Sequence, residues 1–245
     1  MKKKLKLFVI IFLVVYGILG LRAALAAKGA MTSVKKAAGA VQLQDLNATK
    51  AYLQDAQSDF ESTKTALVPF TPLRYIPFFG WYIADAQRGV NAAFEGMTAA
   101  NVFVEAVTPY ADVLGLQGEG NFLGGTAQER LAKAVETLAI VTPQVENVSG
   151  NLKKASDEID GIDTWKYPNF IPGRPGEKID LAKSTLKELQ AFLGDTQPLL
   201  QVLPDIMGQQ EERKYLILFQ NDKELRATGG FITAYAVFRV NKGVI

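Results

Sequence analysis

The sequence predicts a mainly α-helical fold: an N-terminal transmembrane helix, then an elongated α-helical bundle or stalk, then the first β-hairpin of a truncated α/β domain. Three observations support this prediction. A basic start precedes a long apolar run, apolar residues then recur at steps of three and four between Pro/Gly-rich breaks, and a strand pattern begins after Lys214. We therefore expect three parts, at residues 1–27, 28–210 and 211–245.

Residues 1–27 are predicted to form a transmembrane signal-anchor. The run from Leu7 to Leu21 carries no charge, and extending it to Ala27 reaches the length of about 20 residues that a membrane span needs. Four lysines among the first six residues place the N-terminus in the cytoplasm and the body of this single-pass protein outside it. The alternative is a cleaved signal peptide, because Ala24-Leu25-Ala26 fits the small-x-small cleavage pattern.

The charge distribution and the missing residue types restrict the function. The chain has no Cys and no His, which excludes disulfides, thiol nucleophiles and histidine-based catalysis or metal binding by these residues. Six basic residues and no acidic ones lie in residues 1–28, and the remaining 21 basic and 25 acidic residues give the body a net charge of −4. This mildly acidic body argues against a nucleic-acid partner, because phosphate binding needs a clustered basic face.

Residues 28–210 are predicted to be extracytoplasmic and helical. The expected helices cover residues 45–67, 81–114, 126–159, 179–193 and 198–207. Pro109 and Pro143 are expected to break or kink the second and third helices, and Thr126-Ala127-Gln128-Glu129 is a capping box that starts the third. Ala-rich antiparallel helices joined by Pro/Gly loops, such as residues 115–125, predict an elongated bundle.

Two of these helices show an apolar seam whose steps of three and four place it on one helix face, where it can be buried against a neighbour. The seams consist of Leu46, Thr49, Leu53, Ala56, Phe60, Thr63 and Leu67, and of Leu131, Val135, Leu138, Val141, Val145, Val148, Leu152, Ala155 and Ile159.

An aromatic-rich turn is predicted between the first two stalk helices, where Pro69, Pro72 and Pro77 cannot continue a helix. Its aromatic side chains have two interpretations. They form a wedge that packs into the helix junction, which we favour because aromatic residues near prolines usually pack into a core, or they form a membrane-facing patch. The residues concerned are Phe70, Tyr75, Phe78, Phe79 and Trp81.

The last 35 residues change to a strand pattern. Tyr215–Phe219 is a continuous apolar run, typical of a strand covered on both faces, and Phe231–Val240 alternates like a strand with one well-buried face. Asn241–Gly243 is a predicted turn, and Val244 is expected to begin a third strand. Two strands do not form an independent domain, so the sequence predicts that the chain ends inside its last domain.

The loop between these strands is the candidate ligand-binding site, because polar side chains at a strand end are held rigidly enough to converge on a ligand. Arg226 offers a planar fork for phosphate or carboxylate, and glycines let backbone amides approach an anion closely. The simpler alternative is that Glu224 pairs with Arg226 and that the glycines only make the turn. The candidate residues are Asn221, Glu224, Arg226, Thr228, Gly229 and Gly230.

The segment LFQNDKELRATGGFITAYAVFRVNKGVI, at residues 218–245, resembles a bacterial envelope family catalogued as domain of unknown function 4012, and the anchor and Ala-rich helical region resemble that family in layout. The motif residues are Gln220, Asn221, Glu224, Arg226, Thr228, Gly229, Gly230, Phe231 and Ile232. The segment is also similar to the LytR-CpsA-Psr envelope proteins, although their Arg/Asp motifs are not visible in these residues. That similarity implies transfer of glycopolymers from polyprenyl-pyrophosphate lipids with the help of a divalent cation.

The sequence therefore supports two function classes. One is an envelope glycopolymer transferase that handles a polyprenyl-pyrophosphate-linked lipid at the cell membrane, with Glu224 either holding Arg226 or helping to bind the implied divalent cation. The other is a non-catalytic envelope scaffold or binding protein, whose helical stalk binds partners or spaces a domain from the membrane. The sequence identifies no catalytic residue and no metal-binding site formed by the protein.

Overall fold

The computed structural model describes residues 2–111, 116, 126–221, 223–224, 226–227 and 229–245. The chain forms the five long helices α1 (Lys2–Gln42), α2 (Leu46–Leu67), α3 (Phe79–Val107), α4 (Ala127–Asp160) and α5 (Pro175–Ile206), and the two strands β1 (Arg213–Asn221) and β2 (Phe231–Val240). Short 3₁₀ helices η1 (Val68–Tyr75), η2 (Thr108–Tyr110) and η3 (Thr164–Lys166) lie between them. The predicted mainly helical fold is confirmed.

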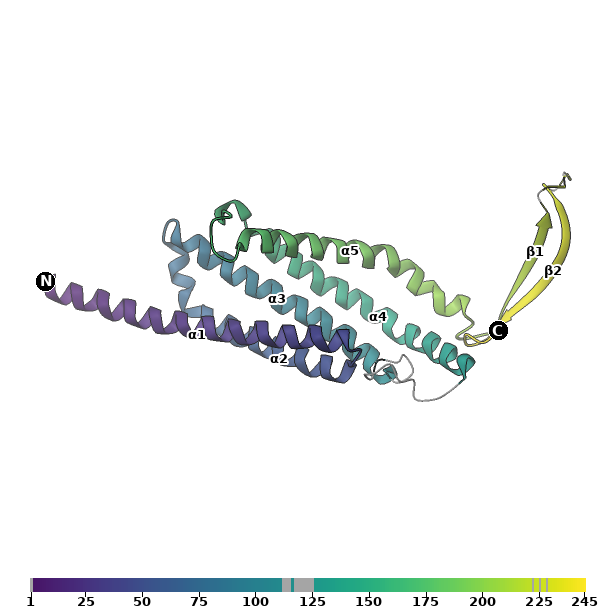
Figure 1. Ribbon diagram of the computed structural model, residues 1–245, viewed down its shortest axis with the longest axis horizontal. Coiled ribbons are helices and arrows are strands. Elements are labelled where there is room, and N and C mark those ends of the chain that lie inside the picture. The colour runs from purple at the N-terminus through teal and green to yellow at the C-terminus, as the bar shows by residue number, and fades with distance from the viewer. Residues whose placement is uncertain (1, 112–115, 117–125, 222, 225, 228) are drawn as a thin grey trace.

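The helices run side by side along one long axis (Figure 1). The N-terminal part of α1 projects beyond one end of the bundle, where the α2–α3 and α4–α5 turns also lie, and we call this the proximal end. The hairpin of β1 and β2 extends from the opposite, distal end. The two termini of the described chain therefore lie at opposite ends of the molecule.

Helix α1 is continuous over 41 residues and passes the expected boundary between residues 27 and 28 without a break. Its segment Ile10–Gln42 is the one helical segment among the described residues that is long and apolar enough to cross a membrane. The large apolar side chains of its N-terminal part, such as Leu13 and Ile18, are exposed. This helix is consistent with a signal anchor or a signal sequence.

Small side chains let α1 and α2 pack closely. Ala23, Ala30 and Ala37 recur every seven residues along α1 and are all buried, as expected for a coiled-coil seam. The buried face of α2 consists of Thr49, Leu53, Ala56, Phe60 and Thr63, which confirms the centre of the predicted seam. Asp45 caps the start of α2 by accepting a hydrogen bond of 2.9 Å from the amide of Ala48.

The other helices add small apolar clusters to the same bundle. Ala37, Leu53 and Val104 join α1, α2 and α3, while Ala99, Val148 and Leu152 join α3 and α4. The predicted seam of α4 is buried at Val135 and from Val145 to Ile159, whereas Leu131 at its start is exposed and Leu138 and Val141 are half-buried. The core therefore consists of small clusters along the axis of the bundle, built mostly from small side chains.

The helix boundaries confirm some predictions and correct others. Helix α3 ends at Val107, just before Pro109, and the predicted residues up to Leu114 lie outside the described part of the chain. The capping box at Thr126 is present, with both reciprocal hydrogen bonds to Glu129. The prediction of two helices after residue 179 is wrong: α5 is one helix that contains Pro198 and Pro204. A proline removes one backbone hydrogen bond and bends a helix, but the flanking turns can continue it.

The favoured interpretation of the aromatic turn is wrong for most of its residues. Tyr75 is 89% exposed and Phe78 is 72% exposed, and Phe79 and Trp81 also keep about half of their surface in contact with solvent. Only Phe70 packs inward, with its ring 5.5 Å from that of Tyr16 in α1. The turn is closed by its 3₁₀ backbone and by Phe70, so the other aromatic rings are not needed to fill the junction.

Strands β1 and β2 form an antiparallel hairpin in which Ile217 lies opposite Ala236. The predicted burial of both strands is wrong for the described chain, because Leu216 is 64% exposed and Ile232 is 45% exposed, and none of the described helices covers either face. The base of the hairpin is fixed by hydrogen bonds from the amides of Lys242 and Gly243 to the carbonyls of Gly208 and Met207, just after the end of α5. Val244 forms an isolated bridge with Asn241 rather than a third strand.

Candidate functional site

The predicted binding loop lies at the tip of the hairpin, away from the helical bundle (Figure 1). Asn221 is the last residue of β1, and a bulge between Phe219 and Gln220 shifts the register just before it. The side-chain oxygen of Asn221 accepts a hydrogen bond of 3.2 Å from the amide of Lys223. Such a contact is a local turn of the kind that Asn makes readily, so Asn221 shapes the start of the loop.

Glu224 and Arg226 form an ion pair in which Nη2 of the guanidinium lies 2.8 Å from Oε1 of the carboxylate. Both side chains remain about half exposed. The guanidinium also lies over the ring of Phe231, 5.1 Å from its centre, in a cation–π contact. Arg226 is therefore held from two sides, and the pair expected from the simpler alternative is present.

The two glycines have separate structural roles. Gly229 has a φ of +89°, which only glycine adopts without strain, and its amide donates a hydrogen bond of 2.9 Å to the carbonyl of Arg226. A Cβ atom on Gly230 would lie 2.6 Å from the carbonyl oxygen of Asn221, so a side chain does not fit there. Thr228, the remaining predicted site residue, lies outside the described residues.

A family model described as "Protein of unknown function (DUF4012)" matches residues 210–245. The hairpin resembles a family without an assigned activity. The match covers both strands and the loop, whereas helices α1 to α5 lie outside it. No curated protein and no solved structure matches the chain, and these comparisons give no support to a similarity with the LytR-CpsA-Psr proteins.

The loop residues that the structure describes do not assemble a ligand set for a divalent cation. Glu224 is their one carboxylate, and it is engaged by Arg226. Across all described residues, no group of three or more acidic side chains is placed to hold a metal ion. The described loop residues therefore do not fit the divalent cation that the resemblance implied.

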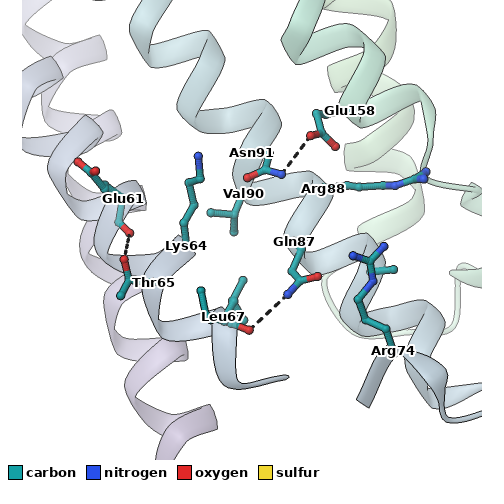
Figure 2. Close-up of a pocket in the computed structure, with 12 residues that line it drawn as sticks. Glu61, Lys64, Thr65, Leu67, Arg74, Gln87, Arg88, Val90, Asn91 and Glu158 are labelled. Carbon is teal, nitrogen blue, oxygen red and sulfur yellow. Dashed lines mark hydrogen bonds between the residues drawn. The ribbon is translucent and has the colours of Figure 1, made fainter. Parts of the chain in front are cut away.

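The bundle contains a polar groove that sequence reasoning missed. It has a volume of about 560 Å³ and lies between α2, α3 and η1 at the proximal half of the bundle. Figure 2 shows Lys64 on α2 across from Asn91 on α3, whose amide donates a hydrogen bond of 3.0 Å to Glu158 on α4, while the carboxylate of Glu61 points away from Asn91. Arg88 turns away from the groove and donates to the carbonyl of Gly161. The groove is lined by both signs of charge and draws its residues from four segments, so no local motif could reveal it.

A second feature missed from the sequence is a buried ionic cluster that joins α3 to the α4–α5 turn. Asp85, only 5% exposed, accepts hydrogen bonds of 3.3 Å from Lys166 and 3.1 Å from the hydroxyl of Tyr167. Burial, the nearby charge of Asp85 and this hydrogen bond raise the pKa of Tyr167 well above its ordinary value. In the sequence, the feature that could have pointed to this cluster was the carboxylate of Asp85, two residues after the apolar Ile83. Because each of its polar groups is paired, we assign the cluster a structural role.

Proposed function

We propose that this protein is a single-pass, outward-facing cell-envelope protein, whose helical bundle spaces the hairpin region at residues 211–245 from the cell membrane. One observation carries the proposal: α1 projects from the proximal end, and the hairpin extends from the distal end. An anchor and a presented domain at opposite ends of a bundle are the arrangement that a spacer requires. The lysines before the apolar run place the bundle outside the cytoplasm.

The length of the bundle sets the expected distance between the membrane and the hairpin. Helix α4 contains 34 residues. At about 1.5 Å per residue it is about 51 Å long, so a bundle standing on the membrane would hold the hairpin at roughly that height. The buried faces of α1, α2 and α4 hold these helices to their neighbours over most of this distance.

Membrane anchoring is tested by carbonate extraction of membranes that contain the full chain. An uncleaved α1 keeps the protein in the membrane fraction, because a spanning helix resists extraction that removes peripheral proteins. N-terminal sequencing of the recovered protein is the second measurement. A mature chain that begins at Ala27 would show a cleaved signal and would overturn the anchor.

The spacing is tested by energy transfer to an acceptor dye at the surface of vesicles. Because the chain has no cysteine, single donors can be attached at Tyr235→Cys in the hairpin and at Asn169→Cys in the α4–α5 turn. We expect strong transfer from position 169 and weak transfer from position 235. Equal transfer from the two positions would mean that the bundle lies flat on the membrane.

A second candidate, transfer of an envelope glycopolymer from a polyprenyl-pyrophosphate lipid, is favoured by one observation. The guanidinium of Arg226 is half exposed although it is held by Glu224 and Phe231, so it presents an oriented donor surface to an anion. Arg226→Lys keeps the charge and loses the fork, and should weaken binding of a polyprenyl-pyrophosphate analogue. Unchanged affinity, with stability monitored in parallel, would remove this candidate.

A further inference from the structure

We propose that the proximal end of the bundle is seated in the outer leaflet of the membrane and completes the span that α1 begins. The surface concerned, which we call the aromatic end, consists of Tyr75, Phe78, Phe79, Trp81, Trp165 and Phe170. The inference rests on the proposed anchoring of α1. It adds a lipid-binding surface formed by two turns that are far apart in the sequence.

The two turns form one surface. Trp81, at the start of α3, lies 6.4 Å from Trp165 in η3, measured between ring centres. Tyr82 and Tyr167 make a second ring contact at 5.6 Å, and the ion pair of Asp85 with Lys166 fixes the turns to each other. Trp165 is 73% exposed and Phe170 is 85% exposed, so the rings of the second turn extend the exposed surface of the first.

Contacts with α1 show how far this surface lies along the anchor. The hydroxyl of Tyr16 donates a hydrogen bond of 3.2 Å to the carbonyl of Pro69, and its ring packs on Phe70. Gly20 lies beside the ring of Phe70, because a Cβ atom added to Gly20 would be 3.8 Å from the tip of that ring. The α2–α3 turn is therefore level with residues 16–20 of α1, and only the part of α1 before them is free of the bundle.

This free part is too short to cross a membrane by itself. The uncharged residues before Tyr16, residues 7–15, rise about 14 Å, whereas the hydrocarbon core is about 30 Å thick. Lys6 and Arg22 lie 16 residues or about 24 Å apart, so long side chains that snorkel outward would let them mark the two borders of the core. Arg22 lies six residues or about 9 Å beyond Tyr16, so a turn level with Tyr16 would enter the core within the depth of 5–10 Å that interfacial elements reach.

The composition of the aromatic end fits this position. Trp and Tyr concentrate at membrane interfaces, where an apolar ring with a polar edge is favoured, and an exposed aromatic surface of this kind is unusual on a domain surrounded by water. Pro69, Pro72 and Pro77 lack amide donors, and the amides of Ile76 and Gly80 are hydrogen-bonded within the turn. Few backbone donors are thus left unpaired where water is scarce.

The native tryptophans provide a direct test, because the two in the chain, Trp81 and Trp165, both belong to the aromatic end. The full-length protein is reconstituted into phosphatidylcholine vesicles with bromine atoms placed near the headgroup or near the ends of the acyl chains. Single-tryptophan forms are made with Trp81→Phe or Trp165→Phe. We expect both tryptophans to lose emission, and to lose more of it to bromines near the headgroup.

Two reporters in a chain that lacks both native tryptophans complete the design. Leu13→Trp lies in the free part of α1 and should be quenched, whereas Tyr235→Trp in the exposed hairpin should not. Quenched Leu13→Trp with unquenched native tryptophans would overturn the aromatic end and leave the anchor intact. Native emission that instead changes with the protein-to-lipid ratio would point to a second copy covering the surface, and would also overturn the inference.

The remaining outcomes count against the inference as well. Unquenched Leu13→Trp would overturn both the anchor and the aromatic end that rests on it. Quenching of Tyr235→Trp to the same extent as the native tryptophans would show that the whole molecule collapses onto the bilayer, which contradicts a surface confined to the proximal end.

Discussion

The helical bundle and the terminal hairpin both carry strong apolar patterns, but only the bundle buries them within the described chain. Leu53 in α2 is 6% exposed and contacts residues of α1 and α3, whereas Leu216 in β1 is 64% exposed. The difference lies in the number of neighbours: each inner helix has other helices beside it, and the hairpin has only its own two strands. An apolar pattern therefore shows that a segment can be buried, and a neighbouring element decides whether it is.

The largest expected effect is a direct contrast between these two leucines. Leu53→Ala should lower the free energy of unfolding by about 2–5 kcal/mol, because it removes buried methyl groups and leaves a cavity. Leu216→Ala should change it by less than about 0.5 kcal/mol, as expected for an exposed site. Urea unfolding of the full chain in detergent, followed by circular dichroism, measures both. Similar losses at the two positions would show that the hairpin has a partner in solution.

The buried ionic cluster provides the next contrast, this time within the bundle. Asp85→Ala removes the buried partner of Lys166 and Tyr167, and should cost about 3 kcal/mol, at the lower end of the range for breaking a buried pair. Lys166 keeps its second partner, Asp163, at 3.3 Å, which limits the loss. Asp163 is itself exposed, so the matched variant Asp163→Ala should cost less than about 1 kcal/mol. Equal costs measured by urea unfolding would contradict the assigned burial of Asp85.

Alkaline pH tests the same cluster through Tyr167. Its pKa is raised in the folded protein from an ordinary value of 10.0, so the folded state holds this proton more tightly than the unfolded state. The stabilising contribution is complete below about pH 10 and is lost as the pH rises above that value. The unfolding free energy should fall over this range, and should fall less steeply in Tyr167→Phe. Parallel curves for the two proteins would count against the proposed contact with Asp85.

The smallest effect is expected at the loop of the hairpin. Glu224→Gln removes the charge that pairs with Arg226, and exposed pairs of this kind contribute about 0–1 kcal/mol. The unfolding free energy should therefore barely change. A loss comparable with that of Asp85→Ala would show that the loop is part of a more tightly packed structure than the hairpin alone provides.

Predictions from the sequence succeeded where the deciding contacts are local. The seam of α2, the capping box at Thr126 and the end of α3 before Pro109 each depend on residues a few positions apart. The pair of Glu224 and Arg226 is local as well, and it was foreseen as the simpler alternative. Sequence reasoning could not decide whether the loop binds an anion, because any such site would depend on groups from other segments.

The sequence by itself determined the helical periodicity, most of the turn positions, the apolar N-terminal helix and the hairpin, because these follow from backbone geometry and from spacing over a few residues. The tertiary structure alone decided which apolar groups face outward. It left the rings of Tyr75 and Phe78 exposed, and it paired Asp85 with Lys166, 81 positions away. Burial and ion pairing depend on what distant segments bring alongside, and no local pattern contains that information.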